Sequence, residues 1–243
     1  MPYRRLPNTD AARVKALKAA LEKGKKLPPF KLAFSQHSLN KLQAFSPTYE
    51  QSLKFQKQSY EQQINKNNLY KEALQRARLY ISHFIQVTNL AIVRGELTPD
   101  TLQHFGLSHN STTLPSLKTE KEVVEIGDQL IKGETERIRK GVTCITNPTI
   151  AVVKVRYEQF MDAYNYQKTL QKKNKQLLEQ LADLRTEANQ IILQIWNEVE
   201  DHYKDLPEDM KREKSIEYGL VYVYRKNELQ KVRFLETSQK DIG

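Results

Sequence analysis

Histidine and cysteine are the two residue types that most often supply transition-metal ligands or nucleophiles near neutral pH. A carboxylate-bridged di-iron site in a helical bundle needs Glu-x-x-His on two helices, and none of the five histidines has Glu three residues before it. Glu198 precedes His202 by four residues, within the acidic stretch NEVEDH. Such a stretch is typical of a solvated helix face. The sequence therefore predicts no metal site.

Cys144 is the one cysteine, and its surroundings do not favour nucleophilic chemistry. A thiolate nucleophile needs a nearby base, but GVTCITNP (141–148) holds no charged residue within three positions of Cys144. We expect a buried structural thiol in a reducing compartment, the cytoplasm. Motifs for phosphate loops, Gly-x-Ser-x-Gly hydrolases and His-Glu-x-x-His metalloenzymes are absent from the sequence. We therefore expect a protein that is not an enzyme and holds no cofactor.

The excess of positive charge lies near the N-terminus. The formal net charge is +10, and residues 1–31 contain nine basic residues against two acidic ones. A local field of this kind attracts acidic partners. We expect residues 1–31 to bind an acidic protein or the phosphates of a nucleic acid, with an ordinary solvated helix face as the alternative. The predicted binding residues are Arg4, Arg5, Arg13, Lys15, Lys18, Lys23, Lys25 and Lys26.

The elements that position these basic side chains are expected to be helices, because apolar residues recur at helical spacing along most of the sequence. Only 8 Gly and 9 Pro occur in 243 residues, which disfavours strand-rich folds with many tight turns. Caps and breakers place the expected helices at about 10–23 (ended by Gly24), 35–45, 47–94 (started by Ser46-Pro47), 120–140 and 148–204. The longest apolar runs, such as LVYVY (220–224), are far shorter than the ~20 residues of a membrane span. No membrane insertion is expected.

A heptad seam is the most regular pattern in the sequence. Apolar residues recur at alternating steps of three and four within the expected helix 148–204, a spacing typical of coiled coils. The seam is predicted to be buried inside the bundle or between two copies of the chain, which would make a homo-oligomer. Its main members are Phe160, Leu170, Asn174, Leu177, Leu181, Leu184, Ile191 and Ile195.

The C-terminal part of the sequence changes from helical spacing to residue types that favour strands. EYGLVYVY (217–224) and KVRFLE (231–236) are rich in β-branched and aromatic residues, which predicts a β-hairpin over about 217–236. Because an isolated hairpin is marginally stable in water, it must pack on the helices or pair with another strand.

Together these patterns predict a mostly α protein. We expect an elongated antiparallel bundle of long, coiled-coil-like helices with a small C-terminal β-hairpin. Along the chain, residues 1–45 form a basic helical extension, 46–215 the bundle, and 216–243 the hairpin and tail. The expected function is that of a non-enzymatic scaffold or assembly protein that docks on an acidic partner. The alternative is a nucleic-acid-binding or ribosome-associated protein.

Overall fold

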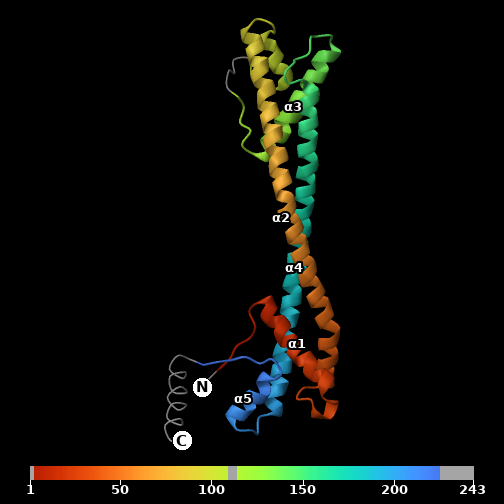
Figure 1. Cartoon of the computed structure of the whole chain (residues 1–243), viewed down its shortest axis with the longest axis vertical. Coiled ribbons are helices and arrows are strands. Elements are labelled where there is room, and N and C mark those ends of the chain that lie inside the picture. Colours follow the sequence, from red (N-terminus) through yellow and green to blue (C-terminus); the bar gives the residue numbers. More distant parts are fainter. Residues whose placement is uncertain (1–2, 109–113, 225–243) are drawn as a thin grey trace. The chain divides into compact units, whose positions relative to one another are not determined.

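The fold is mostly α, as the sequence predicted (Figure 1). The structure is a computed structural model, and it describes residues 3–108 and 114–224. In chain order the elements are β1 (Tyr3–Arg4), α1 (Asp10–Lys26), a 3-10 helix (Pro29–Lys31), α2 (Gln36–Val93), a 3-10 helix (Pro99–Phe105), α3 (Glu120–Arg139), α4 (Ile150–His202), α5 (Glu208–Ile216) and β2 (Tyr222–Val223).

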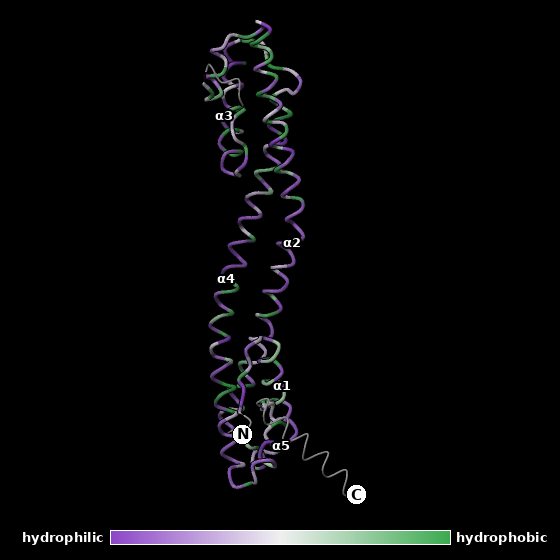
Figure 2. Tube along the Cα trace, turned by 90° about the vertical axis from the view of Figure 1, so that its left-hand side faces the viewer, coloured by the Kyte–Doolittle hydropathy of each residue, from purple (hydrophilic) through white to green (hydrophobic). Residues whose placement is uncertain are grey.

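The chain forms two compact units. Residues 1–57 and 175–243 make up one, which we call the split unit, and residues 58–174 make up the other, the continuous unit. The long helices α2 and α4 contribute to both units. Hydrophobic and hydrophilic residues alternate along each of these helices (Figure 2). The predicted segments 1–45, 46–215 and 216–243 follow the order of the chain, whereas the split unit joins segments that are distant in sequence.

Helix α1 packs closely on the first turn of α2 in the split unit. Thr9 caps α1, and its Oγ1 accepts a hydrogen bond from the Ala12 N–H at 3.2 Å. The predicted end at Gly24 is wrong, because α1 continues to Lys26. A Cβ on Gly24 would lie 2.3 Å from Leu39 Cδ1, so the missing side chain serves helix packing here rather than a helix stop.

Helix α2 is continuous through Pro47, so the predicted break between 35–45 and 47–94 is also wrong. The helix begins one residue after Ser35, whose Oγ accepts from the Ser38 N–H at 3.2 Å. Glu198 of α4 accepts from the Ser35 N–H at 2.7 Å. The buried rings of Phe45 and Tyr49 flank Pro47 and anchor this part of the helix in the core. Packing on both sides therefore outweighs the one backbone hydrogen bond that proline removes.

In the split unit α2 and α4 run antiparallel. Ser38 contacts Glu198, and Tyr49, further along α2, shares Asp10 with Arg185, which lies earlier in α4. The core between them and α1 is apolar and contains the chain's one tryptophan, Trp196. Its largest fully buried side chains are Trp196, Tyr49, Tyr218, Leu42, Leu181 and Ile191.

The continuous unit packs α3 against α2 and α4. The predicted capping box is confirmed, since Thr119 and Glu122 each bond the other's backbone N–H. Two glycines of α3 allow close approach: a Cβ on Gly133 would lie 2.1 Å from the His104 backbone oxygen, and one on Gly127 would lie 2.4 Å from Tyr157 Cδ2. The buried core of this unit includes Ile81, Phe84, Phe105, Val123, Leu130, Val153 and Phe160.

The strand predicted within 217–224 is present, and its partner comes from the N-terminal segment. β1 and β2 pair antiparallel, with Tyr3 opposite Val223 and Arg4 opposite Tyr222. Glu200 of α4 accepts from Arg4 Nη1 and from the Tyr222 hydroxyl, both at 2.7 Å. The strand therefore pairs with another strand, as the sequence required. The second strand of the predicted hairpin, 231–236, lies outside the described residues.

The seam of α4 faces the interior of each unit. Phe160, Leu170 and Asn174 are buried in the continuous unit, and Leu181, Ile191 and Ile195 in the split unit, while Leu177 and Leu184 are half-buried. The polar member Asn174 donates from Nδ2 to Gln63 Oε1 of α2 at 2.5 Å. This stripe therefore packs within the chain, and pairing of two copies through α4 stays a prediction.

Candidate partner-binding site

The eight predicted basic residues fall into two groups in the split unit. Four of them form ion pairs with carboxylates of the same chain. Arg4 pairs with Glu200, Arg13 with Asp10, Lys18 with Glu50, and Lys23 with Glu217. Of these, Lys18 is 55% exposed and Arg4 only 22%, so Lys18 still presents its charge to solvent.

Arg13 belongs to a network centred on Asp10, in the first turn of α1. Asp10 accepts from Arg185 Nε at 2.8 Å and Nη2 at 2.6 Å, and from the Tyr49 hydroxyl at 2.9 Å. The Arg185 guanidinium holds the pKa of Asp10 below its usual range. Burial, together with the hydrogen bond to Asp10, raises the pKa of Tyr49 to about 12. Arg13 also donates to Asn189 at 2.8 Å, so its role is to join α1 to α4.

Arg5, Lys15, Lys25 and Lys26 form the second group. They are exposed, and none of them pairs with a carboxylate within the ranges 3–108 and 114–224. On a helix, residues three, four, seven or eleven apart share a face. Four exposed lysines of α1, with Glu22 among them, therefore line one outward face. We call this the α1 basic face: Lys15, Lys18, Lys25 and Lys26.

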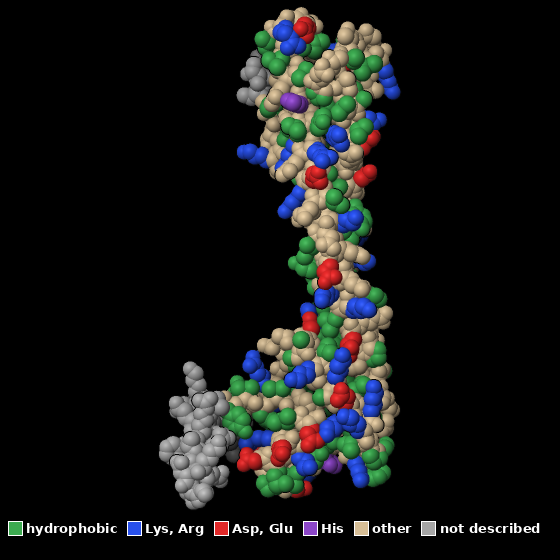
Figure 3. Space-filling model, in the orientation of Figure 1, with side chains coloured by type: hydrophobic (Ala, Val, Ile, Leu, Met, Phe, Trp, Pro, Cys, Tyr) green, Lys and Arg blue, Asp and Glu red, His purple; other side chains and the backbone are tan. Residues whose placement is uncertain are grey.

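Lys and Arg side chains are visible over the part of the split unit that contains α1 (Figure 3). The predicted binding residues Arg4, Arg13 and Lys23 are thus used largely inside the fold, and the four lysines of the α1 basic face together with Arg5 are available to a partner.

A groove opens beside Lys15 of this face. It has a volume of about 590 Å³ and lies between the segment Arg5–Asn8, helix α1 and the segment after α5. Trp196 of α4 also lines it and is only 1% exposed. Most lining residues are apolar, and Arg5 and Lys15 are the charged ones. The lining consists of Arg5, Leu6, Pro7, Asn8, Ala12, Lys15, Ala16, Ala19, Trp196, Ile216, Gly219, Leu220, Val221 and Tyr222.

The sequence did not reveal this groove. Its walls come from residues 5–19 and 196–222, and no local pattern connects two segments so far apart. The one signal was LVYVY (220–224), because a strand that is apolar on both faces is expected to pack against other parts of the protein. In the structure, Tyr222 and Val223 pair with β1, and Leu220 is buried, but Val221 remains 49% exposed and lines the groove.

A second cavity, of about 290 Å³, lies in the continuous unit at Cys144. The prediction that this thiol is buried is wrong: Cys144 is exposed, because it lies in the loop between α3 and α4 while its neighbour Ile145 fills the core. Arg94 also lines this cavity and is paired with Glu96 at 2.7 Å. No histidine lines it, so these walls offer the thiol no imidazole base.

Within residues 3–108 and 114–224, no group of three or more His, Cys, Asp or Glu side chains is arranged to hold a metal ion. Nor does any helix in those ranges combine the length and the apolar character that crossing a bilayer requires.

The split unit thus presents one outward basic face and one adjoining apolar groove as its candidate binding surfaces. Comparison of the chain with protein-family models, with curated proteins and with solved structures found no match.

Proposed function

We propose that this chain is a non-enzymatic interaction protein whose α1 basic face docks on an acidic partner. One observation carries the proposal: Lys15, Lys25 and Lys26 have no carboxylate partner among the described residues and lie exposed on one helix face, next to the mostly exposed Lys18. Four cations on one face attract an acidic surface and raise the rate of encounter.

The balance of charge on the outer face of α1 supports the same proposal. If the N-terminal charge served only to keep an ordinary helix solvated, positive and negative side chains would alternate on its outer face. The α1 basic face instead holds four lysines against Glu22. The acidic Asp10 of this helix is turned inward and pairs with Arg185.

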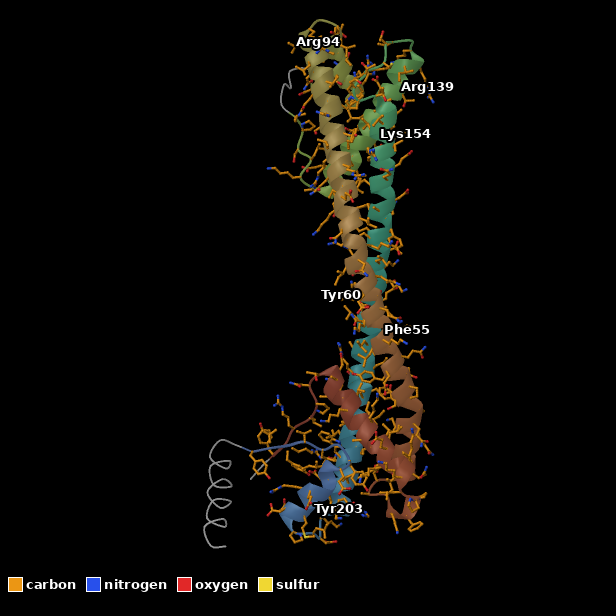
Figure 4. The ribbon with its side chains drawn as sticks, in the orientation of Figure 1. Phe55, Tyr60, Arg94, Arg139, Lys154 and Tyr203 are labelled. Carbon is orange, nitrogen blue, oxygen red and sulfur yellow. The ribbon has the colours of Figure 1, made fainter. Side chains whose placement is uncertain are left out.

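The test compares two variants with the same loss of charge. The first replaces Lys15, Lys18, Lys25 and Lys26 with Gln. The control replaces four exposed basic residues of the continuous unit with Gln: Lys66, Lys71, Arg139 (labelled in Figure 4) and Lys140. Exposed charges contribute little to stability, so both variants should have the same melting temperature as the wild type.

Binding is measured by fluorescence anisotropy with a polyglutamate peptide and with short DNA and RNA duplexes, each at two salt concentrations. We expect the α1 variant to lose binding and the control to keep it. If a duplex binds and polyglutamate does not, the partner is a nucleic acid, and the log–log salt slope should fall by about 0.9 for each phosphate contact removed. Equal binding by the α1 variant and the wild type would refute the proposal.

A further inference from the structure

We infer that the groove beside Lys15 receives apolar side chains from an acidic protein segment. The inference rests on the proposed function, since Lys15 belongs both to the α1 basic face and to the groove wall.

The size and the walls of the groove fit apolar anchors. Its volume of about 590 Å³ falls within the range of about 300–1,000 Å³ found for binding cavities. Three wall residues leave much of their apolar surface in water: Leu6 is 43% exposed, Ile216 55% and Val221 49%. An apolar side chain placed between them would remove this surface from water, which is the main driving force of association.

The charge around the groove selects an acidic segment. Arg5 and Lys15 both line it, and neither forms an ion pair within the described part of the chain. The nearby Arg4 is already bound to Glu200. A segment that carries carboxylates next to its apolar residues would therefore meet two available cations, and the complementary charges would favour it over a neutral or basic segment.

The same walls disfavour a nucleic acid in the groove. Single strands bind by stacking their bases on exposed aromatic faces along a basic track. Trp196 is 1% exposed, so it has no free face, and the other aromatic residue of the wall, Tyr222, is half-buried in β2. Aliphatic walls offer phosphates and sugars no hydrogen bonds, so the apolar part of the groove would stay unused.

Trp196 provides a direct readout of occupancy. It is the one tryptophan of the chain and lines the groove. Because its ring is only 1% exposed, it is already shielded from aqueous quenchers, and the readout is its emission, which should change when a segment fills the groove. A segment that touches only the outer lysines should leave the emission unchanged.

The experiment begins with a selection of short random peptides on the full-length protein. Enriched peptides are expected to combine Leu, Ile, Phe or Met with Asp or Glu. Their affinities are then measured for the wild type and for Val221→Glu, which puts a carboxylate on the groove wall. The matched control is Val155→Glu, because Val155 in the continuous unit is also a valine that is 49% exposed.

Val221→Glu should weaken binding at least about tenfold, because it introduces a repulsive charge at an apolar anchor, and Val155→Glu should leave it within about twofold. A second variant, Ala12→Phe, fills the groove from α1 without adding charge and should weaken binding similarly. Melting temperatures confirm that each variant is folded. Lys15→Gln should weaken binding about two- to fivefold, with a smaller effect at high salt.

Each other outcome refutes the inference, and the two proposals fail separately. If no peptide is enriched, or if peptides bind Val221→Glu like the wild type, the groove is not the site, while loss of binding in the four-lysine variant still supports the α1 basic face. If enriched peptides lack acidic residues, the charge argument is wrong. If sedimentation shows self-association that Val221→Glu abolishes, the occupant is a second copy of this chain.

Discussion

Replacing Glu134 with Ala should strongly destabilise the continuous unit. Glu134 and Arg137 lie one turn apart on α3, are 0% and 2% exposed, and are joined at 2.5 Å between Oε2 and Nη1. The other carboxylate oxygen accepts from the Ile145 N–H at 2.9 Å, and Arg137 Nη2 lies 3.4 Å from the Thr143 carbonyl oxygen. The pair therefore ties α3 to the loop that leads into α4.

The magnitude follows from these contacts. Removing one partner of a buried ion pair costs about 3–5 kcal/mol, because the other charge stays buried without compensation. The Ile145 N–H would also lose its acceptor, and a buried unsatisfied donor costs about 1–3 kcal/mol. Because the two costs overlap, we expect Glu134→Ala to lower the free energy of unfolding by about 4 kcal/mol or more. That is a large share of the about 5–15 kcal/mol that stabilises a typical domain.

Two further variants separate charge from volume. Glu134→Gln keeps the shape and an acceptor for Ile145 but removes the charge, so it should cost less than Glu134→Ala. Glu134→Gln combined with Arg137→Met removes both charges, and it should cost less than Glu134→Ala because no uncompensated charge is left. The control on the same helix is Lys132→Ala, whose exposed pair with Asp128 should contribute no more than about 0.5 kcal/mol.

Urea denaturation followed by circular dichroism measures these differences, since urea, unlike guanidinium, does not screen ion pairs. Hydrogen exchange of the Ile145 amide reports on the loop itself and should accelerate in Glu134→Ala. The reasoning is refuted if Glu134→Ala costs less than about 1 kcal/mol. It is also refuted if the cost of the double variant equals the sum of the single costs, because the two side chains would then act independently.

Three other predictions concern pH and packing. The pKa of Asp10 is lowered, chiefly by Arg185. The contribution of Asp10 to stability is therefore complete above the unfolded pKa of about 3.9 and is lost as the pH falls through the lower, folded pKa. Melting curves between neutral and acid pH should show this loss of stability, and Asp10→Asn should abolish the pH dependence. Leu181→Asp should cost at least about 3 kcal/mol in urea denaturation, because Leu181 is 1% exposed and the change buries a charge; an unchanged melting temperature would contradict this. Gly133→Ala should cost about 1–3 kcal/mol by overpacking, since its Cβ would lie 2.1 Å from the His104 carbonyl oxygen, and a thermal shift assay that finds no loss would disprove that close approach.

Local signals in the sequence were sufficient for most helices. The capping box at Thr119 and Glu122 correctly starts α3, and the three–four spacing identified the buried side of α4. The errors arose where a distant residue decides the local structure. Gly24 continues a helix because Leu39 packs on it, and α2 continues through Pro47 because Phe45 and Tyr49 on either side are buried in the core with α1 and α4.

The candidate site was predictable only as a region. The charge count correctly located the excess of basic residues in the N-terminal segment. It did not separate Arg4 and Arg13, which bond to Glu200 and Asn189 far along the chain, from Lys15, which stays available. Propensity and periodicity describe neighbours within a helix, and they do not encode contacts made across more than a hundred residues.

The division of the split unit between residues 1–57 and 175–243 imposes an order on folding during synthesis. The continuous unit has all of its residues available once residues 58–174 have left the ribosome. α1 and the start of α2 must wait for the partners that α4 and β2 supply. At about 5–20 residues per second this delay is on the order of ten seconds. Throughout that interval the apolar side of α1, Leu17 included, has no core to enter. A nascent chain in this state is a natural client for a chaperone, and a pause in translation before residue 175 would prolong its exposure.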